Sequence, residues 1–225
     1  MVYILNIKYF LGSLLDIIYF NDDKCVCCEE DIYENYLCRR CIKKIMVVNS
    51  CNILEINDHN IKCYSSLYYD GIVREFIKDL KYKSHYNKGR ILSKYMIDTM
   101  DKEKIYYDII TYVPMYRKDE KRRGFNQSKF IAELIDKNKC EKTLQKRKRT
   151  KNQKSLSKDE RWNNLKECFE IYINANVVDK SILIIDDVFT SGATAYTCSE
   201  ILLSNGAKEV NVLTASSGRV KNARL

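Results

Sequence analysis

The chain has 225 residues, 45% of them apolar and 11% aromatic, which is ordinary for a globular protein and argues against a disordered chain. This length leaves room for one sizeable core and a small appendage. The net charge of +9 is concentrated, because residues 142–158 hold eight basic side chains and no acidic one. Such a patch favours a polyanionic partner, either nucleic acid or a multiply phosphorylated substrate, with a solvated positive surface as the alternative.

Features of secreted and membrane proteins are missing from the sequence. No apolar run reaches the ~20 residues needed to cross a bilayer, and no small-residue cleavage site follows residues 1–20. Ten cysteines in such a chain indicate thiols and a metal site rather than a disulfide framework. We therefore expect a cytoplasmic protein without a membrane span.

The first predicted element is a helix over Leu11–Phe20, where apolar residues have helical spacing. We expect it to belong to a small N-terminal domain, residues 1–50, that is followed by a larger domain at 51–225. The boundary itself is expected within 47–61.

Four cysteines of the N-terminal domain have the spacing of a zinc site. Cys25 with Cys28, and Cys38 with Cys41, form two C-x2-C pairs, which supply four thiolates in the tetrahedral arrangement that zinc prefers. Cys27 could replace either neighbour, and a set of small buried apolar cysteines is the alternative. With no acidic motif nearby, the zinc would be structural and would stabilise a domain too small for its own core.

The larger domain begins with alternating strand and helix patterns. An alternating run at 63–69 predicts a strand, and apolar residues recur at helical spacing over 71–83 and 89–100. A buried strand follows at 108–113. It is stopped by Pro114, the only proline of the chain, which indicates a required backbone shape.

A basic segment with a glycine follows this strand. In Arg123–Gln127, Gly124 permits a sharp turn and Asn126 is a good N-cap for a helix that continues over 130–135. Such a segment could close as a loop over an anionic ligand.

The remaining elements complete an alternating pattern. We predict a short strand and a loop within 142–158, a helix at 159–166 and a strand at 169–173. A helix around 201–203, closed by Asn205-Gly206, and a core strand at 209–215 end the chain. Alternating strands and helices predict an α/β fold, a parallel sheet with helices on both faces.

The most informative stretch is 181–195. Four apolar residues at 182–185 form a run that is too short for a helix and suits a strand buried on both faces. Asp186 and Asp187 stand at its carboxyl end, and the small and hydroxyl residues 190–194 precede a helix. Such a loop offers backbone N–H groups to a phosphate, and open α/β sheets bind ligands at the carboxyl ends of their strands.

Two other interpretations of this stretch were weighed. A Walker B strand also ends in two aspartates, but the chain has no G-x-x-x-x-G-K-[ST] sequence to accompany it. A buried strand with a carboxylate pair at a turn is the second alternative. It leaves unexplained why five small or hydroxyl residues follow the pair.

The order of strand, two acids and T-x-G-x-T resembles the 5-phosphoribosyl 1-pyrophosphate (PRPP) motif of type I phosphoribosyltransferases. A strand ending in Pro114, the R-G-F-N-Q run at 123–127 and the series from Arg149 to Phe169 precede it in that order. Behind the four cysteines, this arrangement resembles the ComF family of competence-associated, phosphoribosyltransferase-like proteins over essentially the whole chain. Members often carry a histidine where this chain has Tyr116. Many also have a further C-x2-C pair that is missing here, so only one zinc is expected.

The resemblance implies a site for PRPP. Asp186 and Asp187 would face the ribose hydroxyls. The implied phosphate loop consists of Thr190, Ser191, Gly192, Ala193 and Thr194. The implied pyrophosphate loop consists of Val113, Pro114, Met115 and Tyr116. The implied flexible loop over the site consists of Arg123, Gly124, Phe125, Asn126 and Gln127. Candidate contacts to pyrophosphate or nucleic acid are Lys81, Arg147 and Arg149.

These features predict a phosphoribosyltransferase-type protein that binds PRPP with Mg²⁺ and contains a structural zinc ion. Neither the acceptor nor catalytic activity follows from the sequence. The alternative is a non-enzymatic accessory that binds single-stranded DNA and partner proteins during natural transformation, because a basic segment beside aromatic residues such as Trp162 suits single strands. The family resemblance implies partners in the competence machinery, such as a helicase and DNA-processing factors.

Overall fold

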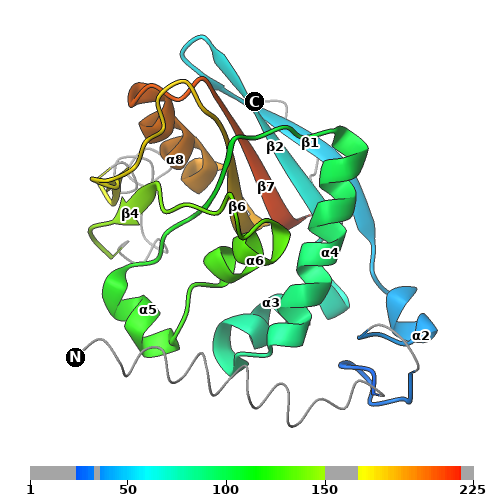
Figure 1. Cartoon of the computed structure of the whole chain (residues 1–225). Helices are drawn as coiled ribbons and strands as arrows, with labels where there is room; N and C mark the ends of the chain where they lie inside the picture. The colour runs from blue at the N-terminus through cyan, green and yellow to red at the C-terminus, as the bar shows by residue number, and fades with distance from the viewer. Residues whose placement is uncertain (1–23, 33–35, 150–166, 219–225) are drawn as a thin grey trace. The chain divides into compact units, whose positions relative to one another are not determined.

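The computed structural model describes residues 24–32, 36–149 and 167–218 (Figure 1). The helices predicted at Leu11–Phe20 and 159–166 lie outside these residues. The chain divides into two compact units, 1–44 and 45–225. This division falls a few residues before the expected one at 50/51, because a strand of the larger unit crosses that position.

The smaller unit is built around short turns. Lys24 and Asp31 form an isolated antiparallel bridge and an ion pair of 3.2 Å. Helix α2 (Arg39–Ile42) follows Cys38, which is its N-cap residue. In the described residues of this unit, 24–32 and 36–44, the buried side chains include three of the predicted cysteine ligands, Cys25, Cys38 and Cys41.

A five-stranded sheet forms the centre of the larger unit (Figure 1). Its strands, in spatial order, are β1 (Val47–Ile56), β2 (His59–Tyr68), β7 (Glu209–Ser217), β6 (Ser181–Phe189) and β3 (Ile109–Tyr112). β1 pairs antiparallel with β2, and the other neighbours are parallel. The predicted parallel α/β sheet is confirmed as a mixed, mostly parallel one. The segment 47–61, expected to contain the boundary, is instead an edge hairpin.

Helices cover both faces of this sheet. Helix α8 (Ala193–Ser204) packs through Cys198 and Leu202 on a cluster that includes Ile184 of β6 and Val212 of β7. The opposite face carries α3 (Gly71–Lys83), α4 (Tyr86–Glu103) and α6 (Gln127–Ile135). On that face the hydroxyl of Thr99 in α4 donates to Ser66 Oγ of β2 over 2.9 Å. The predicted layers are therefore present.

Two smaller pieces flank the carboxyl edge of the sheet. Helix α5 (Arg117–Arg123) follows β3, in a segment that the sequence indicated only as polar and charged. Strands β4 (Leu144–Lys146) and β5 (Phe169–Ile171) form a separate two-stranded antiparallel sheet. The predicted strand at 169–173 is shorter than expected, and Ile173 is exposed. In the part of the chain that the structure describes, no helix is both long and apolar enough to span a membrane.

Candidate functional site

The acidic pair lies near the carboxyl end of β6, as the sequence suggested, and both residues belong to the strand. Successive residues of a strand point to opposite faces, so the two carboxylates have different surroundings. Asp186 lines a hollow beside the loop that leads to α8. Asp187 is 6% exposed and forms an ion pair with Lys81 of α3.

The carboxylate of Asp186 is held by α6. The hydroxyl of Ser128, in the first turn of that helix, donates to Asp186 Oδ1 over 3.1 Å. The backbone N–H of Asp187 donates to the same oxygen over 2.9 Å. Burial and the neighbouring charge of Asp187 disfavour the ionised form and raise the pKa of Asp186 to about 7. This carboxyl group therefore titrates near neutral pH.

The loop after β6 has the geometry of an anion site. Gly192 has a φ of +78°, the left-handed conformation that glycine adopts without strain, and α8 begins at the next residue. A Cβ at this position would lie 3.1 Å from Phe189 Cζ. Among the described residues, none accepts a hydrogen bond from the backbone N–H of Ser191, Gly192, Ala193 or Thr194. These donors are those that a helix N-terminus offers to an anion.

The hollow beside this loop is small. It has a volume of about 20 Å³, which is room for roughly one water molecule. Its lining residues are Val113, Asp186, Val188, Phe189, Thr190, Gly192, Thr194, Ala195, Val212 and Thr214. The structure thus brings Asp186 together with three residues of the implied phosphate loop, while Asp187 faces α3.

The segment Val113–Tyr116 connects this hollow to a second one. Val113 lines the hollow, its N–H donates to the Ile185 carbonyl over 3.0 Å, and its own carbonyl accepts from Asn126 Nδ2 over 3.0 Å. Met115 and Tyr116 instead line a larger cleft. The implied pyrophosphate loop therefore lies between the two hollows.

The larger hollow, which we call the basic cleft, has a volume of about 280 Å³. It is lined by Lys81, Tyr82, Met115, Tyr116, Asp119, Arg122, Arg123, Gln127, Lys146 and Arg149. Five of these residues are cationic and one is acidic. A cleft lined mostly by one sign of charge attracts ligands of the opposite sign.

Most cations of the basic cleft have partners within the protein. Asp119 pairs with Arg122 at 3.4 Å and accepts from Arg149 Nε over 2.9 Å. These ion pairs lower the pKa of Asp119, with Arg149 the main cause. Arg123 donates to Gln127 Oε1 over 2.7 Å and lies 5.6 Å from the centre of the Tyr82 ring.

The implied flexible loop, Arg123–Gln127, is a packed turn in the structure. Gly124 ends α5 with a φ of +94°, as predicted for a sharp turn. Phe125 is 2% exposed and its ring centre lies 5.4 Å from that of Tyr86. Asn126 is the N-cap of α6, as predicted, and accepts from two backbone N–H groups. Aromatic packing and capping hold the segment in this conformation.

The candidate cations named from the sequence are separated by the structure. Lys81 and Arg149 line the basic cleft, but Arg147 pairs with Glu170 at 2.7 Å and does not line it. Sequence reasoning missed Lys146, Arg122 and Ser128. Alternation along β4 was the available signal for Lys146, because neighbours in a strand face opposite sides.

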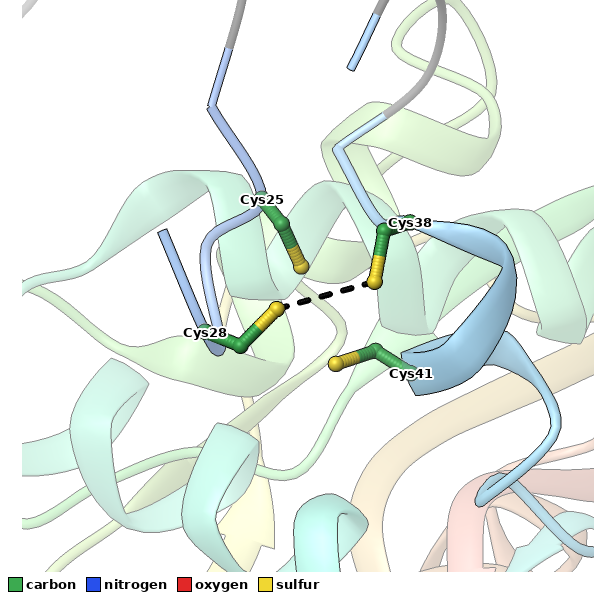
Figure 2. A group of neighbouring side chains, drawn as sticks. All are labelled: Cys25, Cys28, Cys38 and Cys41. Carbon is green, nitrogen blue, oxygen red and sulfur yellow. Dashed lines mark hydrogen bonds between the residues drawn. The ribbon is translucent and has the colours of Figure 1, made fainter. Parts of the chain in front are cut away.

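Four thiols of the smaller unit converge on one point (Figure 2). The Sγ atoms of Cys25, Cys28, Cys38 and Cys41 lie within 4.8 Å of one another, and those of Cys28 and Cys38 are 3.6 Å apart. Tetrahedral zinc with bonds of about 2.3 Å separates its sulfurs by about 3.8 Å. The cluster therefore fits a metal such as zinc, and it contains Cys25 rather than Cys27.

The protonation of these thiols depends on their neighbours. Burial raises the pKa of Cys41, and hydrogen bonds that its thiol donates to the other cysteines add to this effect. Burial also acts to raise the pKa of Cys25, but backbone hydrogen bonds, first that of Cys38, outweigh it and lower the pKa to about 6. A metal ion would favour the thiolate form of all four.

Comparison with curated proteins gives a consistent group of relatives, although no family model matches the chain. Competence protein ComFC of Bacillus subtilis is 26% identical over 61% of this chain and 56% of its own length. The DNA utilization protein YhgH of Escherichia coli K12 is 33% identical over 47% of each chain. Competence protein ComFC of Streptococcus pneumoniae is 23% identical over 86% of this chain and 88% of its own length. The chain spans about half the length of the first curated relatives that it matches.

The chain is similar to the ComF/ComFC competence proteins. The family resemblance drawn from the sequence motifs is thereby confirmed, and the mixed, mostly parallel sheet agrees with the phosphoribosyltransferase-like fold that it implied.

Solved structures similar to this chain include a phosphoribosyltransferase and an enzyme of purine biosynthesis. A hypoxanthine phosphoribosyltransferase from Staphylococcus aureus has a TM-score of 0.37 and 14% identity, over 56% of this chain and 61% of its own. The allosteric regulatory enzyme of purine biosynthesis has a TM-score of 0.37 and 21% identity, over 57% of this chain and 25% of its own. At TM-scores this low, the likeness places no residue of the site.

The cysteine cluster predicts that a variant at one of its four cysteines loses zinc and that a variant at Cys27 retains it. Cys41→Ser should remove one of four ligands and reduce bound zinc from about one ion per chain to well below half, because structural zinc sites need all four positions. Cys27→Ser, outside the cluster, should retain the metal. Plasma mass spectrometry of the dialysed proteins measures both, and loss of zinc from the Cys27 variant alone would contradict the assignment.

The raised pKa of Asp186 predicts a pH-dependent stability. The folded pKa is about 7 and the ordinary value is 3.8, so the folded state holds the proton more tightly. The stabilisation is complete below the ordinary pKa and is lost as the pH rises to about 7. Asp186→Asn removes this titration. The difference in unfolding free energy, variant minus parent, should therefore increase with pH up to about 7 and stay constant above it.

Urea unfolding at about pH 5, 6, 7 and 8 tests this expectation. Asp101→Asn, an exposed position of α4, is the control and should differ from the parent by a constant amount. A difference between parent and Asp186→Asn that does not change with pH would show that Asp186 is ionised throughout.

Proposed function

We propose that the protein binds PRPP as a phosphoribosyltransferase-type protein associated with DNA uptake, with an acceptor that is not identified. The observation that carries the proposal is the position of Asp186. Its carboxylate lines the same hollow as Thr190, Gly192 and Thr194, beside N–H groups that have no acceptor in the described part of the chain. This combination offers an acid for ribose hydroxyls next to donors for a phosphate.

The sugar 5′-phosphate is proposed to bind at the loop before α8. The N–H groups of Ser191 to Thr194 lie at the N-terminal end of α8, where the helix dipole stabilises anions. The hollow itself has space for little more than water, so the ribose would lie across its mouth. In this pose Asp186 would accept hydrogen bonds from the ribose hydroxyls.

The pyrophosphate group is proposed to enter the basic cleft. Met115 and Tyr116 line the cleft while Val113 lines the hollow, so the segment between them spans the distance from sugar to leaving group. Transfer breaks the bond between C1 and pyrophosphate, and the departing oxygens carry the charge. Lys81 and Arg123, which line the cleft, would stabilise that charge electrostatically.

Bound magnesium would supply positive charge that stabilises the departing pyrophosphate. Carboxylate oxygens are suitable partners for this ion and its bound waters. Asp186 and Asp187 supply them at the end of β6, although Asp187 is paired with Lys81 in the free protein. Ligand binding would therefore rearrange that pair.

A second function is favoured by the basic cleft and by the names of the relatives. The relatives are named competence proteins and DNA utilization proteins. Single-stranded DNA carries one negatively charged phosphate per nucleotide, which cations can bind. Cations beside the exposed ring of Tyr82 suit both the backbone and the bases of single-stranded DNA. The protein would then act in the cytoplasm as an accessory that binds DNA and competence-machinery proteins such as a helicase.

Isothermal calorimetry with Mg-PRPP tests the main proposal. The parent protein should bind, and Asp186→Asn combined with Asp187→Asn should weaken binding at least about tenfold, which is about 1.4 kcal/mol. Asp98→Asn, an exposed acid of α4, should bind like the parent. Absence of binding, or equal affinity in the double variant, would reject the proposal.

Single-stranded DNA binding predicts a strong dependence on salt. If several phosphates are neutralised, the logarithm of the affinity should fall linearly with the logarithm of the salt concentration, with a slope of about −0.7 per contact. Fluorescence anisotropy of a labelled oligonucleotide measures this slope. A slope near zero would argue against phosphate contacts.

A further inference from the structure

Lys146 occupies the junction between the pyrophosphate loop and the basic cleft. It is the last residue of β4, and its backbone forms an isolated parallel bridge with Tyr116. Its side chain lines the basic cleft, and its Nζ lies 4.8 Å from the centre of the Phe169 ring. The ammonium group is thus held against an aromatic face at the edge of the cleft.

Lys146 differs from the other cations of the cleft in its polar partners. Lys81 is paired with Asp187, and Arg122 and Arg149 share Asp119. Arg123 donates to an amide oxygen. Within the ranges that the structure describes, Lys146 has neither an ion pair nor a hydrogen bond through its ammonium group.

This arrangement has an energetic cost in the free protein. Partial burial of a cation without an opposite charge disfavours the charged form, and burial lowers the pKa of Lys146. The nearby charges of Asp186 and Asp119 oppose this effect without contacting the ammonium. An anion bound in the cleft would supply the missing partner.

We propose that Lys146 is the residue of the basic cleft that binds the pyrophosphate group directly. This inference rests on the proposed function, since it names the group that receives the leaving pyrophosphate. The ammonium is already partly desolvated and fixed over Phe169, so its hydrogen bonds to phosphate oxygens cost little further ordering. Arg147, the adjacent residue, is directed to Glu170 and is not part of this contact.

The test compares two lysine-to-methionine changes in the full chain. Lys146→Met keeps the length and apolar character of the side chain but removes its charge. Lys142→Met is the matched control, because Lys142 also lies over an aromatic ring, 4.0 Å from the centre of Tyr172, but does not line the cleft. Calorimetric titrations use magnesium pyrophosphate and, separately, ribose 5-phosphate.

Lys146→Met should weaken pyrophosphate binding about tenfold or more, as expected for a lost charge-assisted contact, and leave ribose 5-phosphate binding unchanged. Lys142→Met should bind both ligands like the parent. Lys146→Arg should restore most of the pyrophosphate affinity, which separates loss of charge from loss of folding. Equal pyrophosphate affinity in Lys146→Met and the parent would overturn the inference, as would an equal loss in Lys142→Met.

Failure of the proposed function gives a different result. If pyrophosphate binding depends on Lys146 while Mg-PRPP binding is absent or insensitive to the aspartate double variant, the phosphate contact stands and the PRPP proposal fails. If Lys146→Met reduces the affinities for single-stranded DNA and for pyrophosphate to the same extent, Lys146 is a general phosphate contact and its assignment to the leaving group is wrong.

Discussion

The placement of two adjacent carboxylates inside a buried strand is the constraint on which the rest of the site depends. Alternation along β6 sends Asp186 and Asp187 to opposite sides, so each needs its own partner. Lys81 of α3 meets the second, and Ser128 of α6 donates to the first. These two contacts link α3 and α6 to the carboxyl end of β6, and residues of both helices line the basic cleft.

Local patterns predicted the elements whose periodicity is strong. The apolar residues of the helix predicted at 71–83 are buried in α3, and the Ile-rich run forms the centre of β6. Asn126 caps α6 as its side-chain chemistry indicated. The four cysteines converge because a C-x2-C pair places two thiols on one short turn.

Other features depend on contacts that a sequence does not display. β1 is an edge strand whose exposed positions include the apolar residues Val47 and Ile53. Its sequence therefore lacks the alternation of apolar and polar residues that marks a half-buried strand. Helix α5 has no buried residue and therefore no apolar period. Lys146 became recognisable only when the structure showed which of its neighbours have partners.

The ion pair between Lys81 and Asp187 has a consequence for the magnesium binding proposed above. A carboxylate that already holds a tethered ammonium is a poor trap for free divalent cations, because the incoming ion must displace a competitor of high local concentration. Metal alone should therefore accumulate weakly, whereas a metal that arrives with a polyanion brings the group toward which the released lysine can swing. Under the proposed function, the two aspartates would therefore bind magnesium more readily as its complex with a polyanion than as the free ion.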